Sequence, residues 1–208
     1  MISAASAAGI ALVALGMVLT PGPNMMYLAS RSLSQGRRAG MVSLLGTVTG
    51  FVIYLTLASL GLAGVLLTAR WLYWAVKLAG AAYLLCLAWQ LLRPHGTAVF
   101  QARDLPGEPT PRLFWMGLLT NLLNPKAAIM YLALIPQFIE PARGHVLAQG
   151  FLLGGIQITV SAIVNAAIVL AAAAVAGFFS ARPAWLRGQR LVAGTILAVF
   201  AVRLALGS

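Results

Sequence analysis

Hydrophobic residues fall into six long runs along the chain, and shorter stretches with polar and charged residues separate them. A helix needs about 20 mainly apolar residues to cross the hydrocarbon core of a bilayer. Every run reaches that length, so the pattern predicts an all-α membrane protein. Its six transmembrane helices are expected at residues 5–30, 40–67, 71–92, 113–137, 147–178 and 186–206.

The arginines between the runs predict how these helices are oriented. From the N-terminal tail to the C-terminal end, the successive hydrophilic segments contain 0, 3, 1, 3, 1, 3 and 1 arginines. Positive side chains accumulate in cytoplasmic loops, so the first, third and fifth loops are expected in the cytoplasm. Both termini are then expected outside.

The longest and most polar loop, 93–112, divides the chain into two parts. It contains Asp104, Glu108 and several prolines near its end, and this composition is typical of a flexible linker. We therefore predict a first three-helix repeat at 1–92, a cytoplasmic linker loop at 93–112 and a second three-helix repeat at 113–208.

A shift of 104 residues places the second half of the sequence on the first without a gap. The segment Met26–Ala29 then coincides with Met130–Ala133, and both read MYLA. Because each half has three predicted helices, an odd number, the second copy would enter the membrane upside down. Such inverted repeats build many secondary transporters. The same shift also pairs Leu19 with Leu123, Pro21 with Pro125, Gly46 with Gly150 and Gly50 with Gly154.

Each half contains a proline-rich break near the middle of its first apolar run. Proline removes a backbone donor and disturbs the preceding turn, and the freed polar groups cannot face lipid. One break alone would be typical of a proline kink that neighbouring helices repair. Two breaks at equivalent positions favour a binding site between broken first and fourth helices. The breaks read Thr20-Pro21-Gly22-Pro23-Asn24 and Asn124-Pro125-Lys126.

Lys126 is the most informative residue, because the second break places it near the bilayer midplane. From there it is roughly 15 Å from either interface, and an ammonium at that depth costs at least about 3 kcal/mol. No Asp or Glu lies within a predicted helix. Lys126 either caps loose carbonyl groups at the break or binds the carboxylate of a substrate, and we favour the second interpretation.

Composition limits the classes of protein that fit. Apolar residues make up 61% of the 208 residues and charged residues 8%, and a soluble domain of this size cannot bury so much apolar surface. The net charge of +11 fits loops that contact anionic lipid headgroups rather than nucleic acid. His95 and His145 lack the spacing of metal ligands, so no metal and no cofactor are expected.

Neutral polar residues accompany the two breaks and predict a polar lining. Gln157, Ser161 and Asn165 recur every four residues, which places them on one face of the fifth helix. Tyr27 and Tyr131 match in the repeat. The residues that we expect to bind a substrate are Pro21, Gly22, Pro23, Asn24, Tyr27, Asn124, Pro125, Lys126, Tyr131, Gln157 and Asn165.

Three stretches make the chain resemble the LysE/RhtB superfamily of bacterial amino-acid exporters. They are TPGPNMMYLASRSLSQGRRAG at 20–40, VKLAGAAYLLCLAWQLLR at 76–93 and FWMGLLTNLLNPKAAIMYLALIPQF at 114–138. The chain looks most similar to the homoserine, threonine and neutral amino-acid efflux branch. It departs from that pattern at Met130 and Tyr131, where family members often have a pair of phenylalanines.

The resemblance implies a multi-pass protein of the bacterial cytoplasmic (inner) membrane that exports amino acids or their derivatives. It implies secondary active transport by alternating access, driven by the proton gradient, with the substrate carboxylate near Lys126. The partners are then a small amino acid, the lipid bilayer and, in some assemblies, a second copy of the chain. An enzyme is not expected, because no acid–base or nucleophile constellation is present. The alternative is a channel or a structural membrane subunit without active transport.

Overall fold

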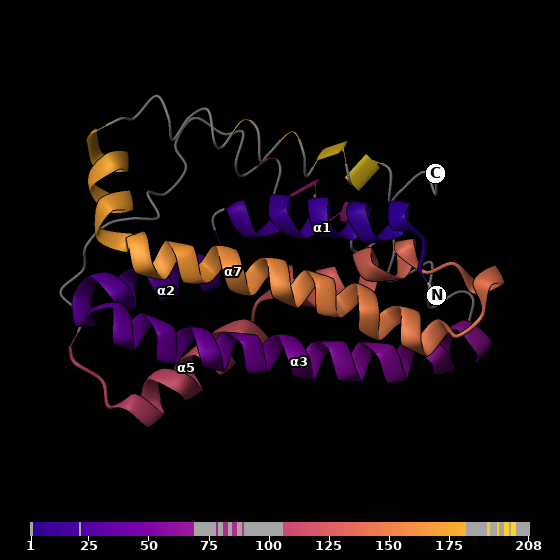
Figure 1. Cartoon of the computed structure of the whole chain (residues 1–208), viewed down its shortest axis with the longest axis horizontal. Coiled ribbons are helices and arrows are strands. Elements are labelled where there is room, and N and C mark those ends of the chain that lie inside the picture. Colours follow the sequence, from indigo (N-terminus) through magenta and orange to yellow (C-terminus); the bar gives the residue numbers. More distant parts are fainter. Residues whose placement is uncertain are drawn as a thin grey trace.

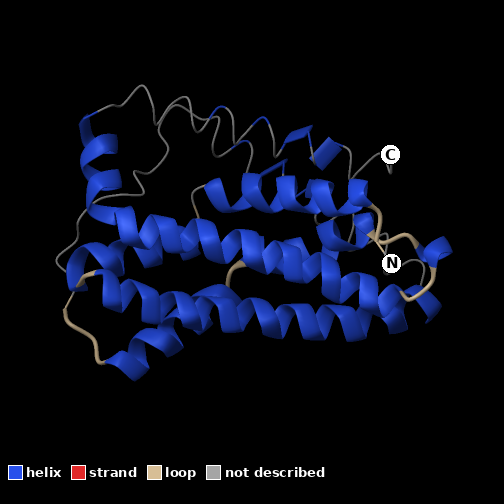
Figure 2. Cartoon of the chain, in the orientation of Figure 1, coloured by secondary structure: helices blue, strands red, loops and turns tan. Residues whose placement is uncertain are grey.

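The part of the chain that the computed structural model describes comprises residues 2–20, 22–68 and 106–181, with isolated positions from 78 to 89 and from 191 to 202. Within this part every regular element is a helix (Figure 2), as the hydrophobic pattern predicted. The predicted third and sixth helices, 71–92 and 186–206, lie outside the described residues except for those isolated positions.

The first broken helix is present as two helices, α1 (Ala4–Leu19) and α2 (Pro23–Gln35), which meet at 56°. At the end of α1, the hydroxyl of Thr20 donates a hydrogen bond of 2.7 Å to the carbonyl oxygen of Gly16. Pro23 is the first residue of α2, where its missing N–H is not needed. The prolines therefore break the helix where the sequence predicted.

The second broken helix repeats this design. Helix α5 (Thr110–Leu122) precedes the break, and α6 (Pro125–Ile129) follows it. The two parts meet at 55°, close to the angle of the first pair. Beyond α6 the chain continues through the π-helical turn η1 (Met130–Leu134) and the 3₁₀ turn η2 (Ile135–Phe138). Asn124 begins the second part, because its side-chain oxygen accepts the N–H of Lys126 at 3.0 Å.

A long helix follows each bent pair. These are α3 (Arg37–Thr68) and α7 (Val146–Ala181), which run side by side through the centre of the molecule (Figure 1). Each is long and apolar enough to cross a membrane, and the described residues contain up to four spans if each bent pair counts as one. They correspond to the predicted first, second, fourth and fifth helices.

The predicted first loop is much shorter than expected. Helix α2 continues to Gln35 and α3 starts at Arg37, so only Gly36 separates them. Gly36 has a φ of 85°, a conformation that residues with a Cβ avoid. Arg31, which the sequence placed in this loop, is instead a helical residue with 5% of its surface exposed. Glu108, between the linker and α5, lies 4.0 Å from its guanidinium.

Helices α3 and α5 pack with their backbones in contact. A Cβ atom on Gly46 would lie 2.0 Å from the carbonyl oxygen of Phe114, and one on Gly117 would lie 2.1 Å from that of Ser43. Such contacts are possible only between glycines and a bare backbone. Gly154 of α7 packs closely on Leu55 of α3, so α3 has tight neighbours on two sides.

Glu140 joins the two halves of the chain at the opposite end from Glu108. It follows η2, and its carboxylate accepts the Ser6 hydroxyl of α1 at 2.8 Å. Arg143, in the 3₁₀ turn η3 (Pro141–Arg143), pairs with the same carboxylate. Hydrogen bonds from the side chains of Ser3, Ser6 and Arg143 lower the pKa of Glu140 to about 2, so Glu140 remains ionised near neutral pH.

This lowered pKa makes the contribution of Glu140 to stability depend on pH. A carboxyl group whose pKa is lower in the folded state stabilises it above the ordinary pKa of 4.5, and loses that effect as the pH falls towards 2. We expect Glu140→Gln to lower the melting temperature of the detergent-purified protein at pH 7. The difference from the wild type should shrink below pH 4.5. A difference that stays constant down to pH 3 would contradict the role of these hydrogen bonds.

Candidate functional site

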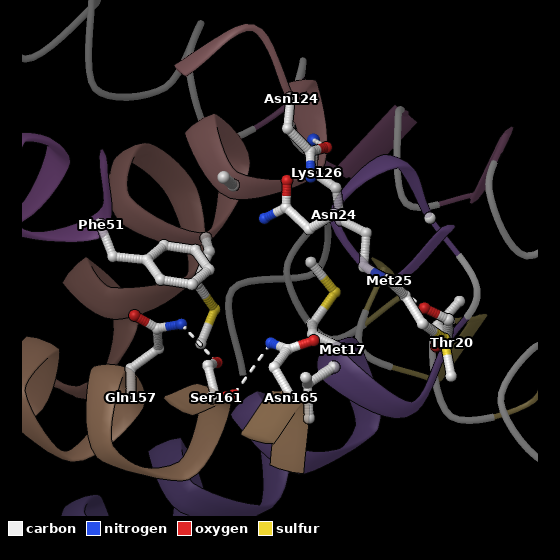
Figure 3. A pocket seen from close by; sticks show the side chains of 14 residues that line it. Met17, Thr20, Asn24, Met25, Phe51, Asn124, Lys126, Gln157, Ser161 and Asn165 are labelled. Carbon is white, nitrogen blue, oxygen red and sulfur yellow. Dashed lines mark hydrogen bonds between the residues drawn. The ribbon is translucent and has the colours of Figure 1, made fainter. Parts of the chain in front are cut away.

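A cavity lies where the two breaks meet α3 and α7 (Figure 3). Its volume is about 50 Å³, which is room for a few water molecules. One side is polar and the other is apolar. The lining residues are Met17, Val18, Thr20, Gly22, Asn24, Met25, Phe51, Asn124, Lys126, Ala127, Met130, Gln157, Ser161 and Asn165.

Lys126 connects the two breaks across this cavity. Its side chain extends from the first turn of α6, and its ammonium donates a hydrogen bond of 2.6 Å to the carbonyl oxygen of Thr20. A Cβ atom on Gly22 would lie 3.4 Å from the same ammonium, so the lysine reaches the first break directly beside this glycine. Each of the two roles considered for Lys126 therefore agrees with part of its position. Its ammonium caps a loose carbonyl group at the first break, and the residue also lines the cavity.

The charge of Lys126 has no acidic partner in the described part of the chain. Both carboxylates that the structure describes there pair with arginines, Glu108 with Arg112 and Glu140 with Arg143. Both also lie at the ends of the helices rather than at the breaks. The cavity thus combines a half-buried positive charge with neutral hydrogen-bonding groups, an arrangement that suits an anionic group.

Three residues of α7 form the polar side of the cavity, as their spacing predicted. The Gln157 amide donates to the hydroxyl of Ser161 at 2.9 Å, and the Asn165 amide donates to the carbonyl oxygen of Ser161 at 2.8 Å (Figure 3). The oxygen of Gln157 accepts the hydroxyl of Tyr131. Tyr131 itself does not line the cavity. Its ring stacks on Tyr54, with centroids 5.7 Å apart and planes 9° apart, and it supports Gln157 from behind.

The other residues that were predicted to bind a substrate fall into three groups by their position in the structure. Gly22, Asn24 and Asn124 line the cavity. Pro23 and Pro125 begin the helices that follow the breaks and are not among the lining residues, while Pro21 lies outside the described residues.

Tyr27 is not in the lining either, although it matches Tyr131 in the repeat. Its hydroxyl lies 3.1 Å from the Ser43 hydroxyl and donates a hydrogen bond of 3.1 Å to the carbonyl oxygen of Leu113. It therefore joins α2 to α3 and α5.

Sequence reasoning missed the apolar side of the cavity. Met17 lies three residues before Thr20, Met25 directly follows Asn24, and Met130 lies four residues after Lys126. The spacing of Met17 and Met130 was a usable signal, because residues three or four apart share a helix face. Phe51 of α3 carried no such signal, since only the packing of α3 brings it to the cavity. The remaining unpredicted lining residues are Val18 and Ala127. Thr20 and Ser161 also line the cavity; the sequence placed them in the first break and in the polar lining, but not among the residues expected to bind a substrate.

The sequence was compared with protein families, curated proteins and solved structures. The family described as LysE type translocator matches residues 15–208. A leucine efflux protein of Salmonella typhimurium is 29% identical over 192 residues, which cover 92% of this chain and 91% of the relative. A homoserine/homoserine lactone efflux protein of the same organism is 31% identical over 172 residues, which cover 83% of this chain and 79% of the relative.

A threonine efflux protein of Escherichia coli is 30% identical over 135 residues, which cover 62% of this chain and 65% of the relative. No solved structure gives a significant match. The family match at residues 15–208 includes both breaks and every described residue that lines the cavity.

Proposed function

This chain belongs to the LysE type translocator family, and on that premise we propose that it is a secondary active exporter. Its cargo would be amino acids or their derivatives, and it would act in the bacterial cytoplasmic membrane. The names of the relatives support this proposal, since they describe efflux of leucine, of homoserine and its lactone, and of threonine. All of these compounds are amino acids or close derivatives.

Lys126 is the observation that carries the proposal. Its ammonium contacts the cavity and has a main-chain oxygen, but no described carboxylate, as its partner. A substrate carboxylate would form an ion pair with the ammonium, in which both partners are charged, whereas the Thr20 carbonyl oxygen is a neutral acceptor. The substrate would therefore compete with Thr20 for the lysine. Asn24 and Asn124, on either side of the lysine, would contact the rest of the substrate backbone.

The two breaks support alternating access. They are equivalent in sequence, they bend their helices by 56° and 55°, and they contribute residues to one cavity. We infer that the chain consists of two inverted three-helix repeats, whose exchange of conformations would open the cavity first to one side of the membrane and then to the other. The proposed orientation places both termini outside.

Proton coupling is proposed at the same place. Among the described residues that line the cavity, Lys126 alone is titratable. A proton that crosses the membrane through this site would therefore be bound and released by its amine. Glu140 is unsuited to this role, because its pKa of about 2 keeps it ionised.

Purified protein in liposomes tests the proposal. Liposomes loaded with a panel of labelled amino acids should release at least one of them with saturable kinetics, and an acidic outer medium should accelerate the release. A protonophore should remove that acceleration. Release that does not saturate and ignores the pH gradient would indicate a channel. The absence of release, relative to protein-free liposomes, for every amino acid tested would indicate a structural subunit.

A further inference from the structure

Asn165 presents an unused hydrogen-bond acceptor to the cavity. This residue of α7 lines the cavity with 2% of its surface exposed. Its amide nitrogen donates to the carbonyl oxygen of Ser161 at 2.8 Å, whereas its amide oxygen is buried and has no hydrogen-bond partner among the described residues. Figure 3 shows the nitrogen turned towards Ser161 and the oxygen on the other side of the amide.

The orientation of this amide follows from its surroundings. A carbonyl oxygen can only accept a hydrogen bond, so the atom of Asn165 that faces Ser161 must be the nitrogen. The oxygen is then directed away from the α7 backbone. Buried acceptors without a donor are rare in proteins because they are unfavourable. An acceptor of this kind at a cavity is explained if a ligand supplies the donor.

The positive charge of Lys126, which lines the same cavity, determines which kind of ligand can supply the donor for Asn165. Lys126 attracts the anionic end of a ligand to the same cavity, and an amino acid carries an ammonium next to its carboxylate. We propose that the side-chain oxygen of Asn165 binds the α-ammonium of the substrate while Lys126 binds its carboxylate. This inference rests on the function proposed above and deepens it, because it makes the site selective for zwitterions over simple carboxylic acids.

An amide suits this role better than a carboxylate would. An aspartate at position 165 would attract the substrate ammonium more strongly, but it would also neutralise Lys126 and weaken the binding of the substrate carboxylate. A neutral acceptor leaves the lysine charge available. The asparagine oxygen and the lysine therefore recognise the two ends of the substrate without pairing with each other.

The test compares leucine with 4-methylpentanoate, which has the same carbon chain and carboxylate but no amino group. Binding of both is measured on the purified full-length protein in detergent, by competition with labelled leucine. We expect the wild type to prefer leucine. Asn165→Leu, which keeps the shape of the side chain and removes its acceptor, should weaken leucine binding on the order of 10- to 100-fold, as expected for a hydrogen bond to a charged group.

The affinity for 4-methylpentanoate should stay unchanged in that variant, which also shows that the variant is folded. If Asn165→Leu does not accumulate, Asn165→Ala makes the same comparison with a smaller side chain. The matched control is Asn121→Leu. Asn121 is a buried asparagine of α5 whose side-chain nitrogen and oxygen also lack partners, but it does not line the cavity. We expect this control to retain the preference for leucine.

Two results would overturn the inference while the proposed function stands. One is an equal loss of affinity for both ligands in Asn165→Leu, and the other is an unchanged preference for leucine. Both would leave leucine binding by the wild type intact. A wild-type protein that binds neither ligand, and releases no amino acid from liposomes, would instead contradict the proposed function and this inference together.

Discussion

Replacing Lys126 by methionine is expected to abolish export, with an initial rate at least about a hundredfold lower than that of the wild type. Methionine has a similar length and no charge, so it can still fill the space beside Gly22. It cannot bind a carboxylate, and loss of one partner from a buried charge pair costs about 3–5 kcal/mol. The measurement is efflux of a labelled amino acid from liposomes that contain equal amounts of each protein.

The control for this experiment is Arg38→Gln, which also removes one positive charge. Arg38 is an exposed residue at the start of α3, far along the chain from both breaks, and its replacement should leave export near the wild-type rate. Because Lys126→Met also leaves the Thr20 carbonyl without its donor, the abundance of folded protein must be measured for each variant. Normal export by Lys126→Met at equal abundance would refute the proposed role of the lysine.

Replacing Gly46 by alanine should strongly destabilise the folded protein. The added methyl group would lie 2.0 Å from the carbonyl oxygen of Phe114 and 2.9 Å from the backbone nitrogen of Leu118. Both atoms belong to the backbone of α5, so no side chain can move aside and the two helices must separate. We expect a loss of about 3 kcal/mol, at the upper end of the usual cost of overpacking.

Gly155→Ala is the matched control, because a Cβ atom at Gly155 has no neighbour within 4 Å. Alanine is also the better helix former, so this variant should be as stable as the wild type or slightly more so. Thermal unfolding of the two detergent-purified variants, measured by size-exclusion chromatography after heating, compares them directly. Equal midpoints for both would show that α3 and α5 are not as closely packed as the structure indicates.

The features that could be predicted from the sequence are those that a few neighbouring residues determine. Proline within an apolar run removes a backbone donor and disturbs the preceding turn, so both breaks were predicted at the right residues. The four-residue spacing of Gln157, Ser161 and Asn165 fixes their common face on any helix, and all three line the cavity. The presence of Lys126 at a break likewise needed no knowledge of packing.

Features that depend on packing could not be predicted. Phe51 reaches the cavity only because of how α3 lies beside the breaks. Tyr27 matches Tyr131 in sequence, yet the two rings meet different neighbours, so repetition in sequence did not give them the same surroundings. The burial of Arg31 depends on contacts with Pro106 and Glu108, which are more than 70 positions away along the chain.

The glycine contact between α3 and α5 has a consequence for the transport cycle. Helix α3 comes from the first half of the sequence and α5 from the second. Because their backbones touch, there is no layer of side chains between them that would let one helix slide along the other. We therefore expect α3 and α5 to move together as one rigid body during the transport cycle. The hinges of the cycle would then lie at the two proline breaks. Each part that moves would contain helices from both halves of the sequence, so the moving parts would differ from the two sequence repeats.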